Sequence, residues 1–382
     1  MRDAVIVDAV RAPIGRRKGT LQQVHPVDLA ADVLTALAAR NNLDPALVED
    51  VIFGCVTQIA EQSNNVGRLA SLAAGWPEEI PGVTIDRACG SSQQAVSFAA
   101  ASVIAGHYDI VVAGGVESMD RVPLGSARAV GEPFGPRVKA RYQRDSFSQG
   151  LGAEDIARRW GFSRTQLDEF ALESHAKAAA ATDSGAFARQ LIPITGPDGE
   201  LTVDEGIRRG GTLEKLATLK PAFLEGGVIH AGNSSQISDG SAALLITTSE
   251  RAAELGWTPI ARFHSGAVVG DDPVTMLTAP IPATAKVLKR AGLTIDDIGV
   301  YEVNEAFASV PLAWEADTGA DHAKLNPLGG AIAVGHPLGA SGAILMTRMV
   351  HHMRDNGIRY GLQTMCEAGG MANATVIELL AD

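Results

Sequence analysis

Two distant stretches of this chain repeat the same order of predicted elements, and this internal duplication constrains the fold more than any other feature. Residues 42–56 read as a helix end, a short acidic turn and a strand, and residues 292–303 read the same way. Each stretch then leads to a glycine-containing turn, a second helix and another strand. The matched order predicts an α/β protein with two similar halves.

The spacing of apolar residues defines the expected elements of each half. In the first half we expect strands at 4–10, 51–56 and 109–113, helices at 27–40 and 91–105, and a turn at Gly114-Gly115. In the second half we expect a strand at 300–303, a helix at 340–353 and a strand at 362–366. The first strand alternates too little to be half exposed, so we expect it to be buried on both faces.

A different kind of segment, residues 120–235, separates the two halves. Its first part is rich in Gly, Pro and Arg, and its middle contains an alanine-rich amphipathic helix at 164–181. This composition predicts an inserted loop domain. Such insertions commonly shape a binding site, although a surface loop with no role in binding fits the composition nearly as well.

Composition narrows the class of partner. The 382 residues carry a formal net charge of −12, which argues against a broad surface for nucleic acid or anionic membrane. The first residues lack the pattern of a secretory signal, and no apolar stretch approaches the ~18 to 20 residues that span a bilayer. The three cysteines form no CxxC motif. We therefore expect a cytoplasmic protein in a reducing setting.

Cys89 is a candidate nucleophile because it lies between a predicted strand and a predicted helix, in residues 86–93 (DRACGSSQ). Unsatisfied backbone N–H groups and the helix dipole at such a position favour the thiolate. A buried structural cysteine is the equally weighted alternative.

His336 lies in a second unusual segment, residues 335–342 (GHPLGASG). Glycines allow the backbone to approach a ligand closely, and Pro337 fixes the chain beside an imidazole that can act as a base or a donor. The alternative is a helix-entry turn with an ordinary histidine.

Two further candidates follow predicted strands of the second half. Cys366 ends one strand and enters a glycine turn, where its thiol could act as an acid or base. Asn304, with Glu305, follows the strand at 300–303, and this carboxyl edge is where open α/β sheets place ligands. For Cys366 alone, a core cysteine is the stronger expectation.

Together these motifs resemble the thiolase family along essentially the whole chain. The resemblance rests on six segments in the family's order: 11–15 (RAPIG), 89–92 (CGSS), 114–119 (GGVESM), 304–307 (NEAF), 335–337 (GHP) and 366–370 (CEAGG). It implies a five-layered fold of two pseudo-symmetric βαβαβ halves with an inserted loop domain. The implied parts are 1–119 with 236–258, the loop domain 120–235, and 259–382.

The resemblance also implies a reaction and a role for each site residue. Cys89 would attack the keto carbon of 3-oxoacyl-coenzyme A (CoA) and carry the acyl group, with His336 as its activator. Asn304 would hold a water that forms an oxyanion site with His336, and Cys366 would act as acid and base on the acetyl carbon. The backbone N–H groups of Cys89 and Ala368 would form a second oxyanion site.

The resemblance further implies that Ser265 and Lys220 contact CoA, that acyl-CoA and CoA are substrates with no permanently bound cofactor or metal, and that the protein is a homodimer or homotetramer. Two departures bear on the site. Ala368 stands where the family usually has glycine, and a positive φ there would strain it. Gln149 replaces a methionine common in the loop domain.

We therefore expect a degradative 3-ketoacyl-CoA thiolase. An acetoacetyl-CoA-specific acetyltransferase is the alternative. A different condensing enzyme of the same superfold is less favoured because such enzymes typically lack a second cysteine like Cys366. A non-catalytic paralogue is less favoured because no catalytic position is missing.

Overall fold

The computed structural model describes residues 2–129, 131–197 and 199–380. The predicted domain ranges also include residues 1, 130, 198, 381 and 382, which lie outside the described part. None of the described helices is both long and apolar enough to cross a membrane.

One large mixed sheet organises the molecule, and its strand order mirrors itself about the centre. The order is β10-β11-β12-β9-β1-β8-β5-β3-β4, with β2 (Gly15–Arg16) paired to β8. The first-half strands are β1 (Val5–Arg11), β3 (Asp50–Gly54), β4 (Gly82–Ile85), β5 (Ile110–Ser118) and β8 (Ser238–Thr247). Those of the second half are β9 (Ala261–Gly270), β10 (Val300–Val303), β11 (Tyr360–Glu367) and β12 (Met371–Leu379).

The mirrored pairing supports the predicted duplication. Strands β3 and β5 pair in parallel, as do β10 and β11, and β3 also pairs in parallel with the edge strand β4. The other pairs of each half are antiparallel. The halves join where β1 meets β9, through only two registered pairs, Val5 with Arg262 and Ile6 with Ala261. Four strands of each half, β1-β8-β5-β3 and β9-β12-β11-β10, thus share one arrangement, and the first half adds β2 and β4.

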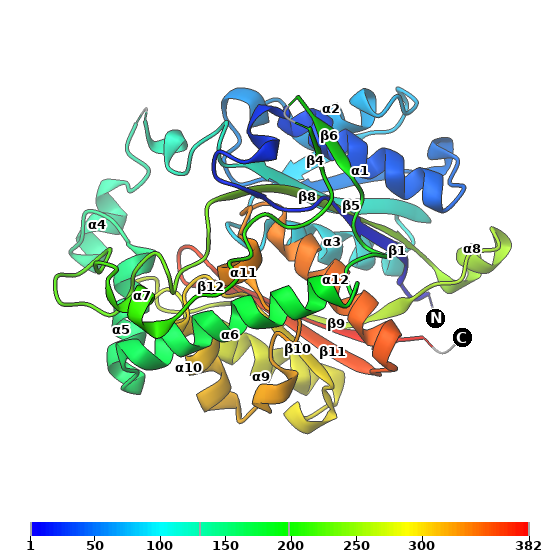
Figure 1. The fold of residues 1–382 in the computed structure, drawn as a ribbon. Coiled ribbons are helices and arrows are strands. Elements are labelled where there is room, and N and C mark those ends of the chain that lie inside the picture. The colour runs from blue at the N-terminus through cyan, green and yellow to red at the C-terminus, as the bar shows by residue number, and fades with distance from the viewer. Residues whose placement is uncertain (1, 130, 198, 381–382) are drawn as a thin grey trace.

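Helices complete a five-layered sandwich, as Figure 1 shows. One outer layer holds α1 (Pro26–Arg40) and α2 (Val66–Ala73), and the other holds α9 (Pro280–Ala291) and α10 (Ser309–Thr318). The central layer holds α3 (Ser91–Ala105) and α12 (Ser341–Asn356), which pack against each other and against both parts of the sheet. Helix α8 (Ser249–Glu254) lies between the halves in sequence.

Small residues allow the two central helices to come close. A Cβ on Gly342 would lie 2.3 Å from the backbone nitrogen of Gln93, and the N–H of Ala343 donates to the Ser92 hydroxyl over 2.9 Å. The first turns of α3 and α12 therefore touch, although one comes from each half.

The loop segment 119–237 lies between β5 and β8, which are neighbours in the sheet. It contains α4 (Pro136–Tyr142), α5 (Gln149–Trp160), α6 (Arg164–Asp183), α7 (Leu213–Ala217), β6 (Ile194–Gly196) and β7 (Gly199–Leu201). In the second half a turn at 368–370 makes the equivalent connection between β11 and β12. Figure 1 shows α6 crossing the side of the molecule.

The predicted turn at Gly114-Gly115 is wrong, because β5 runs through both residues to Ser118. A Cβ on Gly114 would lie 2.1 Å from the carbonyl oxygen of Ala242, and one on Gly115 would lie 2.3 Å from that of Gly339. These glycines are therefore required by close packing within and above the sheet, where a side chain has no room.

Candidate active site

The first turns of α3 and α12 and the carboxyl ends of β10 and β11 meet in one place. Cys89 lies just before α3, and His336 lies in the turn that leads to α12. Asn304 directly follows β10, and its N–H donates to the Thr364 carbonyl of β11 over 3.1 Å. Two residues further along β11 is Cys366. Four predicted site residues therefore come together.

Cys89 is buried, with 4% of its surface exposed, and packs against Leu345 and Met365. Burial raises its pKa to about 12, and the nearby charges of Glu367, Glu117 and Asp86 add to this effect. The position at a helix N-terminus therefore does not produce a resting thiolate, contrary to the sequence-based expectation. The thiol needs a base before it can attack.

His336 is arranged to be that base. Its Nδ1 lies 2.6 Å from the Ser341 hydroxyl, which itself donates to the carbonyl of Pro337 over 2.9 Å. Because the single hydroxyl proton is used on that carbonyl, we assign the proton of the ring to Nδ1, which leaves Nε2 as an acceptor. Burial lowers the pKa of His336 to about 4, so the ring is neutral near pH 7.

Asn304 places its amide beside the same nitrogen. Its Nδ2 lies 3.4 Å from Nε2 of His336, and both side chains are buried. Its Oδ1 has no hydrogen-bond partner among the described residues. A buried amide oxygen that accepts no hydrogen bond from the protein is suited to accept one from a water or a ligand group at this point.

Cys366 is 1% exposed, and burial raises its pKa well above the ordinary value, with a further contribution from the charge of Cys89. The two thiols are therefore close enough to influence each other. Both are protonated at neutral pH, so each can serve as a proton donor until a base removes its proton.

Ala368 does not have the strained positive φ that we considered from the sequence. The left-handed conformations of this turn fall on Gly369, with φ of +88°, and Gly370, with φ of +75°. Ala368 itself is not among the residues of positive φ. Its N–H donates no hydrogen bond to a described residue and is therefore available to a developing oxyanion.

Glu117 is a positioning residue whose role the sequence did not reveal, although it lies in the GGVESM motif. Its buried carboxylate accepts from the N–H of Gly339 over 2.8 Å and from those of Val56 and Thr57 over 2.8 and 3.1 Å. It also accepts from Gln62 over 2.9 Å. Glu117 thus ties the loop after β3 to the turn that carries His336.

Glu367 was also missed, although it directly follows Cys366. Its Oε1 lies 1.9 Å from the place where a Cβ on Gly90 would stand, so the carboxyl packs against the backbone directly after Cys89. Neither oxygen has a hydrogen-bond partner among the described residues, and the side chain is fully buried. Burial raises the pKa of Glu367 to about 8, partly offset by Arg87. The signal was a charged residue at the end of a strand that has no other charged side chain.

The two predicted CoA contacts lie outside this group. Ser265 lies on β9 opposite Val376, whereas Cys366 is registered with Ala372, which pairs with Val269. Four residues of strand, about 13 Å at ~3.3 Å per residue, separate Ser265 from the level of the thiol. The structure does not bring Ser265 to the thiols.

Lys220 is exposed on the loop domain. Its segment also contains Phe223, whose ring contacts that of Phe307 edge to face at 5.7 Å between centroids. This contact connects the Lys220 segment to the NEAF segment, while the lysine itself stays at the surface.

The arrangement can therefore carry out nucleophilic acyl transfer. It offers a thiol, a neutral imidazole whose Nε2 is unprotonated, a second thiol for proton transfer, and an unpaired N–H donor for an oxyanion. Among the described residues there is no group of three or more His, Cys, Asp or Glu side chains that could hold a metal ion.

Comparisons with known proteins agree with this chemistry. The chain matches the family models "Thiolase, N-terminal domain" over residues 4–250 and "Thiolase, C-terminal domain" over residues 257–379. It is 49% identical over 388 residues to a steroid 3-ketoacyl-CoA thiolase of Mycobacterium tuberculosis, covering 100% of this chain and 95% of that protein. It is 44% identical over 389 residues to a 3-ketoacyl-CoA thiolase of Escherichia fergusonii, covering 99% of this chain and 100% of that protein.

A solved structure also resembles this one. The acetyl-CoA acetyltransferase of Bacillus anthracis has a TM-score of 0.92 and 37% sequence identity, covering 100% of this chain and 99% of that chain.

Proposed function

Because this chain belongs to the thiolase family, we propose that it transfers an acyl group between 3-oxoacyl-CoA and CoA through a covalent intermediate on Cys89, in the degradative direction. As a thiolase it is an acyltransferase. The observation that carries the proposal is the hydrogen bond from His336 to Ser341, which leaves Nε2 unprotonated and able to accept the proton of the Cys89 thiol.

The proposed first half-reaction begins with the Cys89 thiol. Its proton moves to Nε2 of His336 while the sulfur attacks the keto carbon. Asn304, through a water on its free Oδ1 side, and His336 stabilise one oxyanion, and the N–H groups of Cys89 and Ala368 stabilise the other. The bond between the α and keto carbons then breaks. The acetyl-CoA carbanion takes the proton of Cys366 and leaves the acyl group on Cys89.

The second half-reaction returns both protons. The thiol of CoA gives its proton to the Cys366 thiolate and attacks the acyl carbon, and the Cys89 thiolate leaves and recovers its proton from His336. CoA and acyl-CoA are the substrates, and no permanently bound cofactor or metal enters any step.

We propose that the chain is divided into the domains that the family resemblance implies. The two halves comprise residues 1–119 with 236–258 and residues 259–382. The loop domain, residues 120–235, binds substrate and CoA, with Lys220 as a candidate for the phosphates, and contributes to contacts between subunits. We propose Ser265 as a contact of the pantetheine arm of CoA, which must extend from the thiols toward the surface.

We propose a broad acyl specificity. Support comes from the names of the 3-ketoacyl-CoA thiolases that this chain resembles. The test is a series of thiolysis rates with 3-oxoacyl-CoA substrates of increasing chain length and one bulky ring-bearing substrate. Turnover of the longer substrates supports the proposal, and turnover of acetoacetyl-CoA alone supports the second candidate, an acetoacetyl-CoA-specific acetyltransferase. The likeness to the acetyl-CoA acetyltransferase of Bacillus anthracis favours that candidate.

We propose that two copies pair through the face that carries β4. This strand ends the sheet, and β4 together with α2 and α3, which contact it, carries four exposed apolar side chains: Leu72, Val83, Phe98 and Ile104 are 39%, 40%, 45% and 42% exposed. Apolar surface beside an unpaired strand edge suits a second chain. Light scattering of wild type and Phe98→Asp tests this, with a monomeric variant as the supporting outcome and an unchanged oligomer as the opposing one. A tetramer would require a second interface, between two such pairs.

We also propose a cytoplasmic location. All three cysteines are unpaired and buried, which suits a reducing compartment. Fractionation of cells that produce the protein tests this location.

A further inference from the structure

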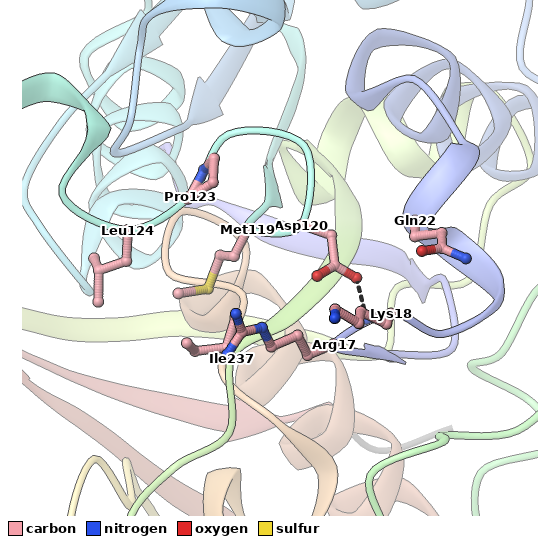
Figure 2. Close-up of a pocket in the computed structure, with 8 residues that line it drawn as sticks. All are labelled: Arg17, Lys18, Gln22, Met119, Asp120, Pro123, Leu124 and Ile237. Atoms are coloured by element: carbon pink, nitrogen blue, oxygen red, sulfur yellow. Dashed lines mark hydrogen bonds between the residues drawn. The ribbon is translucent and has the colours of Figure 1, made fainter. Parts of the chain in front are cut away.

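A cavity of about 410 Å³ lies beside the segments that hold the His336 turn, and no step of the proposed reaction uses it. Figure 2 shows the residues that line it: Arg17, Lys18, Gln22, Met119, Asp120, Pro123, Leu124 and Ile237. Cavities of ~300 to 1,000 Å³ are the usual size of small-molecule sites. The volume is therefore sufficient for a short organic ligand.

The cationic side of the cavity is a turn with an anchored backbone. The Glu205 carboxylate accepts from the N–H groups of Arg16 and Thr20 over 3.1 and 3.2 Å. The Asp120 carboxylate accepts from the N–H of Lys18 over 2.5 Å, the contact dashed in Figure 2. Lys18 has a φ of 56°, a left-handed conformation that is unusual for lysine.

The carboxylates of Glu205 and Asp120 therefore accept hydrogen bonds from backbone N–H groups. Among the described residues, neither the guanidinium of Arg17 nor the ammonium of Lys18 has an ion-pair or hydrogen-bond partner. Asp120 is the acidic residue in the lining, and it is engaged with the Lys18 N–H. Two cationic groups against one carboxylate leave the lining positive, in a chain whose formal net charge is −12.

The opposite side of the cavity is apolar. Met119 is 5% exposed, while Leu124 and Ile237 are 61% and 37% exposed. Figure 2 shows the Arg17 side chain extending in the direction of Met119 and Ile237, and all three side chains line the same cavity. A ligand that fits must therefore combine an anionic group with a short apolar body.

The same apolar residues adjoin the catalytic turn. Ile237 follows Gln236, whose carbonyl accepts the N–H of His336 over 3.1 Å. Met119 lies two residues after Glu117, whose carboxylate accepts the N–H of Gly339. An occupant of the cavity would thus contact both segments that fix the turn of His336.

We propose that this cavity binds a carboxylate on a short apolar chain, with the carboxylate at Arg17 and Lys18 and the chain against Met119, Leu124 and Ile237. Two sources share this chemistry. One is a free carboxylic acid, and the other is the far end of an acyl group that terminates in a carboxylate. The second source rests on the proposed function, and the first does not.

The first experiment measures binding of free hexanoate by NMR of methyl-labelled methionine, with the Met119 signal identified from Met119→Leu. Saturable shifts of Met119 are expected, with hexan-1-ol producing none at the same concentration. Arg17→Gln should weaken binding about tenfold or more, since a hydrogen bond to a charged group contributes ~1.5 to 3 kcal/mol. Lys289→Gln, which removes an exposed charge on α9, is the control and should bind as wild type does.

The second experiment compares thiolysis of 3-oxohexanedioyl-CoA and 3-oxohexanoyl-CoA, which differ in the terminal carboxylate. If the acyl end occupies the cavity, Arg17→Gln lowers the kcat/KM ratio of the first to the second about tenfold, and Lys289→Gln does not. If only free acids bind, that ratio is unchanged while the NMR result stands.

The proposal is overturned if Arg17→Gln changes neither hexanoate binding nor the substrate ratio. Absence of thiolysis in the wild-type protein with every substrate would instead contradict the proposed function. The hexanoate measurement would still decide the binding site in that case. Leu124→Asn provides a second variant at an exposed position, and it should weaken hexanoate more than acetate.

Discussion

The Nδ1 atom of His336 lies 2.6 Å from the hydroxyl of Ser341, and this contact selects the ring form that can accept a proton from Cys89. We predict that Ser341→Ala lowers the rate of Cys89 acylation about 10- to 100-fold, by analogy with the loss of a hydrogen-bond partner that orients a metal-binding histidine. Stopped-flow acylation measures the effect. Ser309→Ala, which removes another buried serine hydroxyl, is the control, and equal losses in both variants would contradict a specific role for Ser341.

Cys89→Ser should abolish turnover while the fold is retained, because a serine hydroxyl is much harder to ionise and this site already disfavours the anion. Wild-type protein treated with acetyl-CoA should gain one acetyl group, mapped to Cys89 by peptide mass spectrometry. Near-normal thiolysis by the serine variant would remove Cys89 from the mechanism.

Cys366 and His336 should fail in different half-reactions. Cys366→Ala removes the proton donor for both the acetyl carbanion and the departing CoA thiolate, but leaves the base in place. A thiolate can leave without being protonated far more readily than a carbanion, so acylation by a simple acyl-CoA should survive better than thiolysis. His336→Ala removes both the base and an oxyanion donor, and a lost donor alone costs about 10² to 10³ in rate. Both half-reactions should therefore suffer.

Acylation and overall thiolysis, measured on both variants, separate these roles. If Cys366→Ala blocks acylation as severely as His336→Ala in a protein that remains folded, the two residues act as one unit. Circular dichroism of each variant provides the control for folding.

The charge of Glu367 should govern how the thiols respond to alkaline pH. Its pKa of about 8 means that the carboxyl is mostly neutral at pH 6.5 and mostly negative at pH 9, where its charge raises the pKa of both Cys89 and Cys366. Glu367→Gln removes that charge. Alkylation of Cys89 should match wild type at pH 6.5 and be about tenfold faster at pH 9, if the charge shifts the thiol pKa by about one unit.

Glu302→Gln is the matched control for that experiment. Burial raises the pKa of Glu302 to about 7, but its charge is not among the influences on either thiol. Equal acceleration in both variants would show that a general loosening of the core, and not the charge of Glu367, sets the reactivity.

Gly114→Ala should destabilise the fold. The added Cβ would lie 2.1 Å from the Ala242 carbonyl on the neighbouring strand, so the sheet must move, at a cost of about 3 kcal/mol or more. Gly135→Ala is the control, because nothing lies within 4 Å of the added atom and the φ of −63° suits alanine. Denaturant unfolding of both variants measures the difference, and similar stability would contradict the packing argument.

Elements defined by local pattern could be predicted well from the sequence. The helix predicted at 91–105 and the strand predicted at 300–303 agree with the structure residue for residue. In both cases apolar spacing and the flanking turn residues act within a few positions of each other. Gly114 and Gly115 show the limit, because their role depends on carbonyls of β8 and of the α12 turn, which are distant in sequence.

The identity of the clustered side chains was more predictable than their protonation. The sequence indicated Cys89, His336, Cys366 and Asn304, and the structure brings them together. Their charge states depend on burial and on Glu367 and Glu117, which reach Cys89 from other strands. Whether Ala368 is strained likewise depends on its φ angle, which the sequence does not reveal. In the structure the positive φ values of this turn fall on Gly369 and Gly370.

The meeting of α3 and α12 at their first turns has a consequence for how such a site could arise. Cys89 comes from one copy of the repeated unit and His336 from the other, and the sheet joins these copies through only two residue pairs. Separate units would have to find each other at a rate and occupancy set by their concentration. Linking them in one polypeptide makes that encounter intramolecular, so the effective concentration of the base near the thiol no longer depends on how much protein the cell contains.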